Sequence, residues 1–276
     1  MEKRMLFMDL DGTLLDDHEQ ITSGNRQALN QALERGHGVI ITTGRPLKSA
    51  LEQARRLGLD KPGCYVIAYN GAMVYDWAKG GTVFSRALEI PSVIRVFEKA
   101  NELGEHIQTY DSFDVLVEAR GDDEAVRRYC KMVSMTHRVI DDVHTDLQEN
   151  PVKCLVINYE KKDGLLQMQQ WIRENMPEMD CFFSCEWFLE VVPKGMNKGE
   201  AVKMLCVLQG VEIENAVAAG DAANDLAMLK AAGIGAAMCN GTDEVKAIAD
   251  YITTRDNNHD GVAEIADRFF YEAVEV

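Results

Sequence analysis

Aspartate side chains that could bind a metal ion stand where two apolar segments of the sequence end. Asp9 and Asp11 close the first of these segments, and Asp221 follows the second, far along the chain. Residues two apart in an extended segment point to the same side, so Asp9 and Asp11 can present their carboxylates together. Carboxylate oxygens suit Mg²⁺ and leave coordination positions for water and phosphate oxygens. One such Asp is more typical of a turn or a helix cap, but three that agree at strand ends favour a metal site.

The segments before these acids predict buried strands of a parallel sheet. Short apolar runs cover residues 5–10, 39–43, 64–69, 216–219 and 234–238. Helical stretches are expected at residues 22–35, 46–57, 197–208, 226–232, 243–249 and 261–270. Strands and helices that alternate in this way pair in parallel, with helices on both faces of the sheet. Ligands bind outside the carboxyl ends of such strands, so the separated acids, and Thr43 with them, should converge there.

The segment between the N-terminal and the C-terminal groups of these strands and helices has a different pattern of elements. Strand candidates at residues 105–110 and 113–118 are joined by a short Asp111-Ser112 turn, which predicts an antiparallel pair. Further elements are expected at residues 152–159, 165–175 and 181–192. We therefore expect an α/β core made of residues 1–84 and 189–276, with residues 85–188 inserted as an α+β domain.

The composition narrows the classes of function. A chain of 276 residues, 46% of them hydrophobic, is long enough to bury two cores. Its 29 basic and 45 acidic residues give a formal charge of −16, which repels phosphate backbones and acidic lipids. We therefore expect neither a nucleic-acid nor a membrane partner. Any bound phosphate must be held by a metal ion and a few well-placed basic side chains.

Other features of the sequence argue against other classes of protein and of binding site. The N-terminal segment does not resemble a signal peptide and no apolar run reaches membrane-spanning length, which predicts a cytoplasmic protein. The seven scattered cysteines indicate reduced thiols, and the close pair Cys181 and Cys185 lacks the further ligands of a zinc site. The segment Gly233–Met238 lacks the third glycine of a dinucleotide-binding turn. The six histidines have no partner at ligand or triad spacing.

Four short motifs resemble those of the haloacid dehalogenase superfamily. Asp9-Leu10-Asp11-Gly12-Thr13 is similar to the first motif, and Gly220-Asp221-Ala222-Ala223-Asn224-Asp225 is similar to the fourth. Thr43-Gly44-Arg45 resembles the second motif as the Cof-type branch has it, and Lys198 resembles the third. Their order and spacing agree over nearly the full chain. The insert between the second and third motifs resembles a type IIB cap, so the resemblance implies a doubly wound, Rossmann-like parallel sheet with an inserted α+β cap.

Three further segments resemble one group within that branch, the YidA-like sugar phosphatases. They are Tyr69-Asn70-Gly71-Ala72, Phe188-Leu189-Glu190-Val191 and Asp260-Gly261-Val262-Ala263. One departure is visible, because Ala223 stands where such proteins often carry Glu. The departure leaves Asp221, Asn224 and Asp225 of the fourth motif intact.

The resemblance implies catalytic roles that suit the side chains. Asp9 would attack phosphorus and carry the phosphoryl group as an aspartyl-phosphate. Asp11 would act as general acid and then as general base. Mg²⁺ would be bound by Asp9, by the main-chain carbonyl of Asp11 and by Asp221.

The resemblance also implies residues that hold the phosphate and the loops around it. Thr43 and Lys198 would bind phosphoryl oxygens, and Gly12 would permit the tight turn that turns main-chain N–H groups toward them. Behind the metal, Asn224 and Asp225 would position Asp221 and Lys198. The weaker candidates for substrate or loop contacts are Arg45, Asn70 and Asn240.

The implied function is a Mg²⁺-dependent phosphatase that acts on a small phosphorylated metabolite. Phosphosugars are the leading class, with pyridoxal phosphate and flavin mononucleotide left open, and the cap is expected to select among them. Two alternatives remain at this point: a phosphomutase with the same aspartyl-phosphate, and a non-enzymatic module that binds a phosphometabolite. A monomer and a homodimer are both compatible with the sequence.

Overall fold

The chain forms two compact units, which the computed structural model describes over residues 2–271. The unit that we call the core domain comprises Met1–Gly44, Ala50–Val83 and Asn197–Val276. The second unit, the inserted domain, comprises Phe84–Met196 together with Arg45–Ser49. The chain thus leaves the core domain and returns to it.

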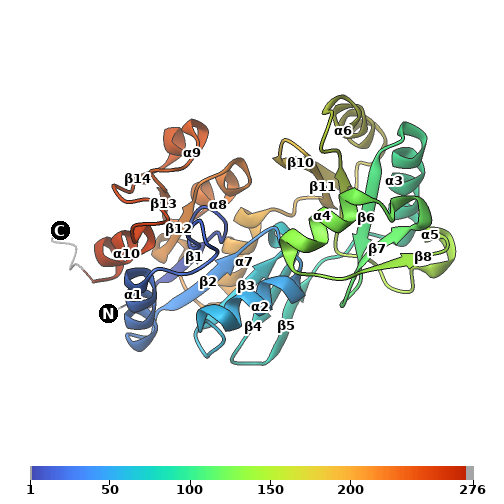
Figure 1. The fold of residues 1–276 in the computed structure, drawn as a ribbon. Helices are drawn as coiled ribbons and strands as arrows, with labels where there is room; N and C mark the ends of the chain where they lie inside the picture. Colours follow the sequence, from blue (N-terminus) through green and yellow to red (C-terminus); the bar gives the residue numbers. More distant parts are fainter. Residues whose placement is uncertain (1, 272–276) are drawn as a thin grey trace. The chain divides into compact units, whose positions relative to one another are not determined.

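The core domain contains an eight-stranded sheet in the order β14-β13-β12-β1-β2-β3-β4-β5 (Figure 1). The strands are β1 (Met5–Met8), β2 (Gly38–Thr42), β3 (Cys64–Ala68), β4 (Met73–Asp76), β5 (Gly81–Ser85), β12 (Ala216–Gly220), β13 (Ile234–Ala237) and β14 (Tyr251–Ile252). Strands β14 to β3 pair in parallel, and β4 returns antiparallel to β3 through a turn at Asn70-Gly71. The predicted parallel sheet is confirmed. Its central strands β1, β2, β3 and β12 are buried along their whole length, which explains their continuous apolar runs.

Helices cover both faces of this sheet, as a doubly wound fold requires. They are α1 (Ser23–Glu34), α2 (Leu47–Leu57), α7 (Lys198–Gln209), α8 (Leu226–Ala231), α9 (Asp243–Ile248) and α10 (Gly261–Ala266). From the centre of the sheet, α1 leads from β1 to β2 and α8 leads in the other direction from β12 to β13. Because such crossovers are right-handed, these two helices lie on opposite faces. Helix α1 packs against α10, and α7 packs against α8 (Figure 1).

The inserted domain contains a six-stranded sheet in the order β10-β11-β9-β6-β7-β8. The strands are β6 (His106–Tyr110), β7 (Val115–Glu118), β8 (His137–Ile140), β9 (Cys154–Ile157), β10 (Met179–Cys185) and β11 (Phe188–Pro193). Strands β6 and β7 form the predicted antiparallel pair, whereas β7 and β8 are parallel. Strand β11 pairs with β10 and β9, so residues 189–196 lie in the inserted domain rather than in the core to which the sequence analysis assigned them. A strand's own residues do not reveal which sheet it joins.

Two long helices and the sheet enclose the core of the inserted domain. Its helices are α3 (Ile90–Leu103), α4 (Glu124–Val133), α5 (Val143–Asp146) and α6 (Asp163–Asn175). Val96 and Phe97 of α3 pack with Met168 and Ile172 of α6 in one buried cluster. Helix α6 was predicted from the sequence and α3 was not, although α3 begins with Ile90-Pro91 and ends at a left-handed Gly104. These are ordinary start and stop signals of a helix.

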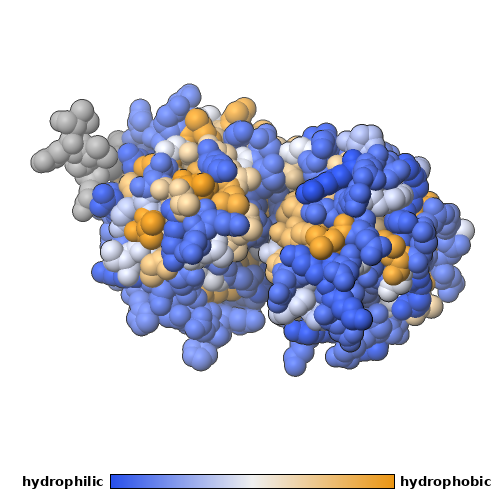
Figure 2. Space-filling model, turned by 90° about the horizontal axis from the view of Figure 1, so that it is seen from above, coloured by the Kyte–Doolittle hydropathy of each residue, from blue (hydrophilic) through white to orange (hydrophobic). Residues whose placement is uncertain are grey.

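Hydrophilic side chains predominate on the face drawn in Figure 2, and the hydrophobic ones form small groups. None of the helices within residues 2–271 has the length and apolar character needed to cross a membrane.

Candidate active site

The first aspartate of the site directly follows the central strand of the core sheet. Strand β1 lies between β2 and β12, and the main-chain N–H of Asp9 continues the pairing by donating to Ala219 O at 3.1 Å. Thr43 directly follows β2, and Asp221 directly follows β12. Three neighbouring parallel strands therefore deliver Asp9, Thr43 and Asp221 to the same edge of the sheet.

Lys198 is the buried cation of this site. Its ammonium Nζ lies 2.6 Å from Asp9 Oδ1 and 2.6 Å from Asp225 Oδ1, and its side chain is completely buried. Lys198 is the first residue of α7, where Asn197 caps the helix by accepting from Glu200 N. The packing of α7 against α8 holds this helix start beside the strand ends. Because a buried ammonium needs charged partners, Lys198 ties the first motif to the fourth.

Asp225 uses both of its carboxylate oxygens inside the protein. Oδ1 accepts from Lys198, and Oδ2 accepts from the main-chain N–H groups of Asp221 and Ala222 at 3.0 and 3.1 Å. The carboxylate therefore fixes the loop that carries Asp221 as well as the lysine. This placement agrees with a residue that positions Asp221 and Lys198 rather than one that binds the metal.

The loop after β1 holds Asp221 from the other side. Thr13 Oγ1 donates to Asp221 Oδ1 at 2.7 Å, a contact that the sequence analysis did not predict, although Thr13 stands within the first motif. Gly12 has a φ of +78°, and a Cβ at that position would lie 2.5 Å from Asp221 Oδ2. Asn240 Nδ2 donates to Gly12 O at 2.8 Å, so Asn240 makes a loop contact. The main chain at Gly12 thus approaches the Asp221 carboxylate more closely than any other residue type would allow.

Gly12→Ala is expected to destabilise the protein by about 1–3 kcal/mol more than Gly36→Ala does. Both glycines have left-handed φ angles, +78° and +83°, but a Cβ on Gly36 meets nothing within 4 Å. The difference between the two variants therefore isolates the collision with Asp221. Chemical denaturation of both variants measures it, and equal losses would show that the loop moves aside without cost.

The acids of the site are electrostatically crowded. Burial raises the pKa of Asp9 well above its ordinary value, Lys198 opposes that rise, and Asp225 adds to it. Burial and the neighbouring Asp225 carboxylate raise the pKa of Asp221 to about 6. Although burial opposes it, the carboxylates of Asp225 and Asp9 raise the pKa of Lys198 and keep it charged. One ammonium does not fully offset this group of acids.

A divalent cation fits the donors that this crowding provides. Carboxylate oxygens of Asp9, Asp221 and Asp225 lie within 4.8 Å of one another. Since Asp225 is already engaged at both oxygens, Asp9 and Asp221 are the side chains suited to hold the ion. Such oxygen donors are typical of Mg²⁺ sites, and a positive ion would favour the ionised forms that burial disfavours. Magnesium is the ion that the chemistry of the site favours.

The structure places the remaining candidates around this group. Asp11 is solvent-exposed, whereas Thr43 is buried and bonds through its main chain to Ile67 and Asn70. Asn224 lies in the short η4 helix (Ala223–Asp225), and its Oδ1 has no hydrogen-bond partner within residues 2–271. Arg45 belongs to the inserted domain, so its role as a substrate contact stays a prediction.

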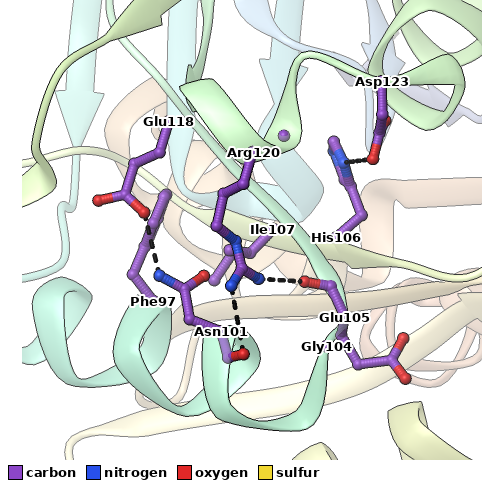
Figure 3. A pocket seen from close by; sticks show the side chains of 10 residues that line it. Phe97, Asn101, Gly104, Glu105, His106, Ile107, Glu118, Arg120 and Asp123 are labelled. Carbon is purple, nitrogen blue, oxygen red and sulfur yellow. Dashed lines mark hydrogen bonds and ion pairs between the residues drawn. The ribbon is translucent and has the colours of Figure 1, made fainter.

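A separate pocket of about 250 Å³ lies within the inserted domain (Figure 3). Arg120 donates to the main-chain oxygens of Asn101 and Glu105, at 3.2 and 3.1 Å, and Asn101 Nδ2 donates to Glu118. His106 pairs with Asp123 at 3.2 Å. The polar groups that line the pocket mainly hold α3, β6 and β7 together, and none of the predicted site residues is among them.

Comparison with known proteins agrees with the motifs and the geometry. The haloacid dehalogenase-like hydrolase family matches residues 6–265. YxeH of Bacillus subtilis is 32% identical over 263 residues, covering 94% of this chain and 96% of its own length. The pyridoxal phosphate phosphatase YbhA of Escherichia coli is 30% identical, covering 96% of this chain and 97% of its own.

Solved structures share the same fold. A haloacid dehalogenase-like hydrolase from Bacteroides thetaiotaomicron superposes with a TM-score of 0.87 at 31% identity, covering 98% of this chain and all of the other. Because the family match spans both the core and the inserted domain, it accounts for the architecture as well as for the motifs. This chain belongs to the haloacid dehalogenase superfamily, in its Cof-type branch, and is a phosphoric monoester hydrolase.

Proposed function

We propose that this protein is a Mg²⁺-dependent phosphatase that hydrolyses a small phosphorylated metabolite, with sugar phosphates as the leading class. Asp9 is the nucleophile and Asp11 the general acid and base. The observation that supports this most directly is the buried Lys198 held between Asp9 and Asp225, beside the Asp221 carboxylate. That arrangement provides an oriented carboxylate, a fixed positive charge and a pair of oxygen ligands.

The first half of the reaction transfers the phosphoryl group to the protein. Asp9 attacks phosphorus in line, so that a new bond forms from its carboxylate oxygen while the ester bond to the leaving oxygen breaks. Lys198 and Thr43 bind phosphoryl oxygens during this step. Asp11 gives its proton to the departing alkoxide, which leaves as the alcohol.

The second half of the reaction restores the enzyme. Asp11 removes a proton from a water molecule that attacks phosphorus, and the acyl-phosphate bond breaks to release inorganic phosphate and the Asp9 carboxylate. Asp225 holds Lys198 and the Asp221 loop in place throughout. Asp9, the main-chain carbonyl of Asp11 and Asp221 would hold Mg²⁺, which would supply positive charge to offset the charge on the phosphoryl oxygens.

A screen for phosphate release tests the proposal. Purified protein with Mg²⁺ is offered phosphosugars, pyridoxal phosphate and flavin mononucleotide, and inorganic phosphate is measured. Pyridoxal phosphate belongs in the panel because the related YbhA is named for it. We expect release from at least one phosphosugar without a bisphosphate activator. Transfer to a second sugar hydroxyl instead would indicate a phosphomutase, and binding without turnover would indicate a non-enzymatic module.

The acidic composition of the chain bears on the location and the partners of the protein. We propose a cytoplasmic monomer or homodimer whose partner is its small substrate, without a nucleic-acid or membrane partner. The net charge of −16 supports this because it disfavours contact with polyanionic surfaces. Light scattering on the purified protein distinguishes the monomer from the dimer.

Mg²⁺ is expected to raise the melting temperature more at about pH 8 than at about pH 5. Burial raises the pKa values of Asp9 and Asp221, the latter to about 6. A raised pKa means that the folded protein binds its proton more tightly than the unfolded chain does. The metal-free protein should therefore lose stability as the pH rises through about 6. Above that pH the ionised carboxylates gain from the cation, and below it protons compete for the same oxygens.

Thermal unfolding with and without Mg²⁺ at both pH values measures this effect. Asp60→Asn, a change at an exposed aspartate of the core domain, serves as the control and should behave like wild type. Asp221→Asn should lose most of the pH-dependent gain. An equal response to Mg²⁺ at both pH values would contradict the assignment of these carboxylates to the metal.

A further inference from the structure

Asn70 is a buried polar residue whose side chain the described protein leaves unsatisfied. Only 1% of the residue is exposed, and neither Oδ1 nor Nδ2 has a hydrogen-bond partner within residues 2–271. A buried amide without partners costs free energy unless something else binds it. The side chain is as thoroughly buried as Thr43 and Lys198, which are each 1% exposed.

The main chain around Asn70 is held in an unusual conformation. Tyr69 and Asn70 have φ angles of +52° and +55°, and both belong to the short η1 helix (Tyr69–Gly71) that follows β3. Asn tolerates the left-handed region, but a bulky Tyr rarely adopts it, and consecutive residues of this kind are maintained only when their surroundings enforce them. Such strain gathers at functional sites. In this conformation Asn70 is buried.

The short η1 helix that carries Asn70 borders the two segments that are proposed to hold phosphate. On one side, Asn70 N donates to Thr43 O at 3.1 Å, and a Cβ on Gly44 would lie 2.9 Å from Asn70 Oδ1. On the other side, a Cβ on Gly71 would lie 2.3 Å from the main-chain oxygen of Asn197, the residue that caps the helix beginning at Lys198. The strand end that carries Thr43 and the helix start that carries Lys198 therefore both border η1.

From this placement we propose that Asn70 is a third phosphate-binding side chain, whose amide Nδ2 donates to a non-bridging oxygen of the bound phosphoryl group. The inference deepens the proposed function and rests on it. A phosphoryl oxygen provides the hydrogen-bond acceptor that Nδ2 lacks within the described residues. The neutral amide also adds a donor without adding charge to a site where Lys198 is already shared by Asp9 and Asp225. Asn70 thus favours the binding of an oxyanion beside Thr43.

Binding of inorganic phosphate, measured by calorimetry with Mg²⁺ present, tests the proposal independently of turnover. Asn70→Asp keeps the shape and tolerates the left-handed φ, but it replaces the donor with a carboxylate that repels phosphate. We expect it to weaken phosphate binding by about tenfold to a hundredfold, the range for a hydrogen bond to a charged group. Asn30→Asp makes the same chemical change in α1, where Asn30 accepts from Lys61, and should leave the affinity within about twofold of wild type.

Asn70→Gly separates binding from folding. Glycine adopts the left-handed conformation readily, so this variant should melt no lower than wild type while it loses about tenfold in phosphate affinity. Wild-type affinity in both Asn70 variants would overturn the proposal. The proposed function itself would fail if the wild-type protein neither bound phosphate nor released it from any substrate. If the wild-type protein binds phosphate and both Asn70 variants bind it equally well, only the role of Asn70 is rejected.

Discussion

Asp9→Asn is expected to abolish phosphate release, lowering kcat by at least about 10⁴-fold. An amide is a poor nucleophile, so the aspartyl-phosphate cannot form, while the near-equal volume leaves the site packed. The amide oxygen can still accept from Lys198, which lies 2.6 Å from the Asp9 carboxylate. The neutral amide also avoids the cost of burying a charge, which is the main cause of the raised pKa of Asp9. The variant should therefore melt at or above the wild-type temperature in the absence of Mg²⁺.

Two measurements decide this prediction. Phosphate release is followed with the best substrate of the screen, and thermal unfolding reports the fold. Asp60→Asn, which makes the same change at an exposed position, is expected to keep wild-type activity. Turnover of Asp9→Asn within tenfold of wild type would show that another group attacks phosphorus.

Lys198→Met is expected to lower the free energy of unfolding by about 3–5 kcal/mol and to reduce kcat by about 10²–10³-fold. Methionine fills much of the lysine's volume but leaves the buried carboxylates of Asp9 and Asp225 without their shared cation. Asp9, whose pKa burial raises, can take up a proton instead, so the loss of stability should shrink as the pH falls toward 5. Denaturant unfolding at neutral and acidic pH measures both effects.

Lys203→Met provides the matched control on the same helix. Lys203 also forms an ion pair, with Glu200 at 2.8 Å, but both side chains are about half exposed. An exposed pair of this kind contributes little, and its loss should cost no more than about 0.5 kcal/mol. If the two lysine variants were equally stable, the buried ammonium would not be the partner on which the two carboxylates depend.

The sequence located the acids of the site because their positions depend on local patterns. Asp9 and Asp221 follow apolar runs that become β1 and β12, and parallel strands present such residues at one edge. The contacts of Lys198 were not predictable in this way. They depend on how α7 packs against α8 and on the orientation of the Asp225 side chain, which are properties of tertiary packing.

Dependence on tertiary packing also explains the features that were not predicted from the sequence. Thr13 and Asp221 are joined by a hydrogen bond across more than two hundred residues, and no local spacing signals such a contact. The domain boundary was placed at residue 188 because β11 resembles any other apolar strand, whereas its pairing with β9 and β10 places it in the inserted domain. Periodicity predicts the type of an element more reliably than its partners.

The discontinuity of the core domain has a consequence for how the chain is made. On the ribosome, β1 can pair early with β2, but its other edge waits for β12, since Met5 pairs with both Gly38 and Ala216. Residues Phe84–Met196 of the inserted domain are synthesised after β2 and before β12. They can collapse first, which shortens the flexible chain that must be closed when β12 pairs with β1. The nascent chain therefore acquires Asp9 long before it acquires Lys198 and Asp221. Activity should appear abruptly, only after the segment that carries Lys198 and Asp221 has emerged from the ribosome.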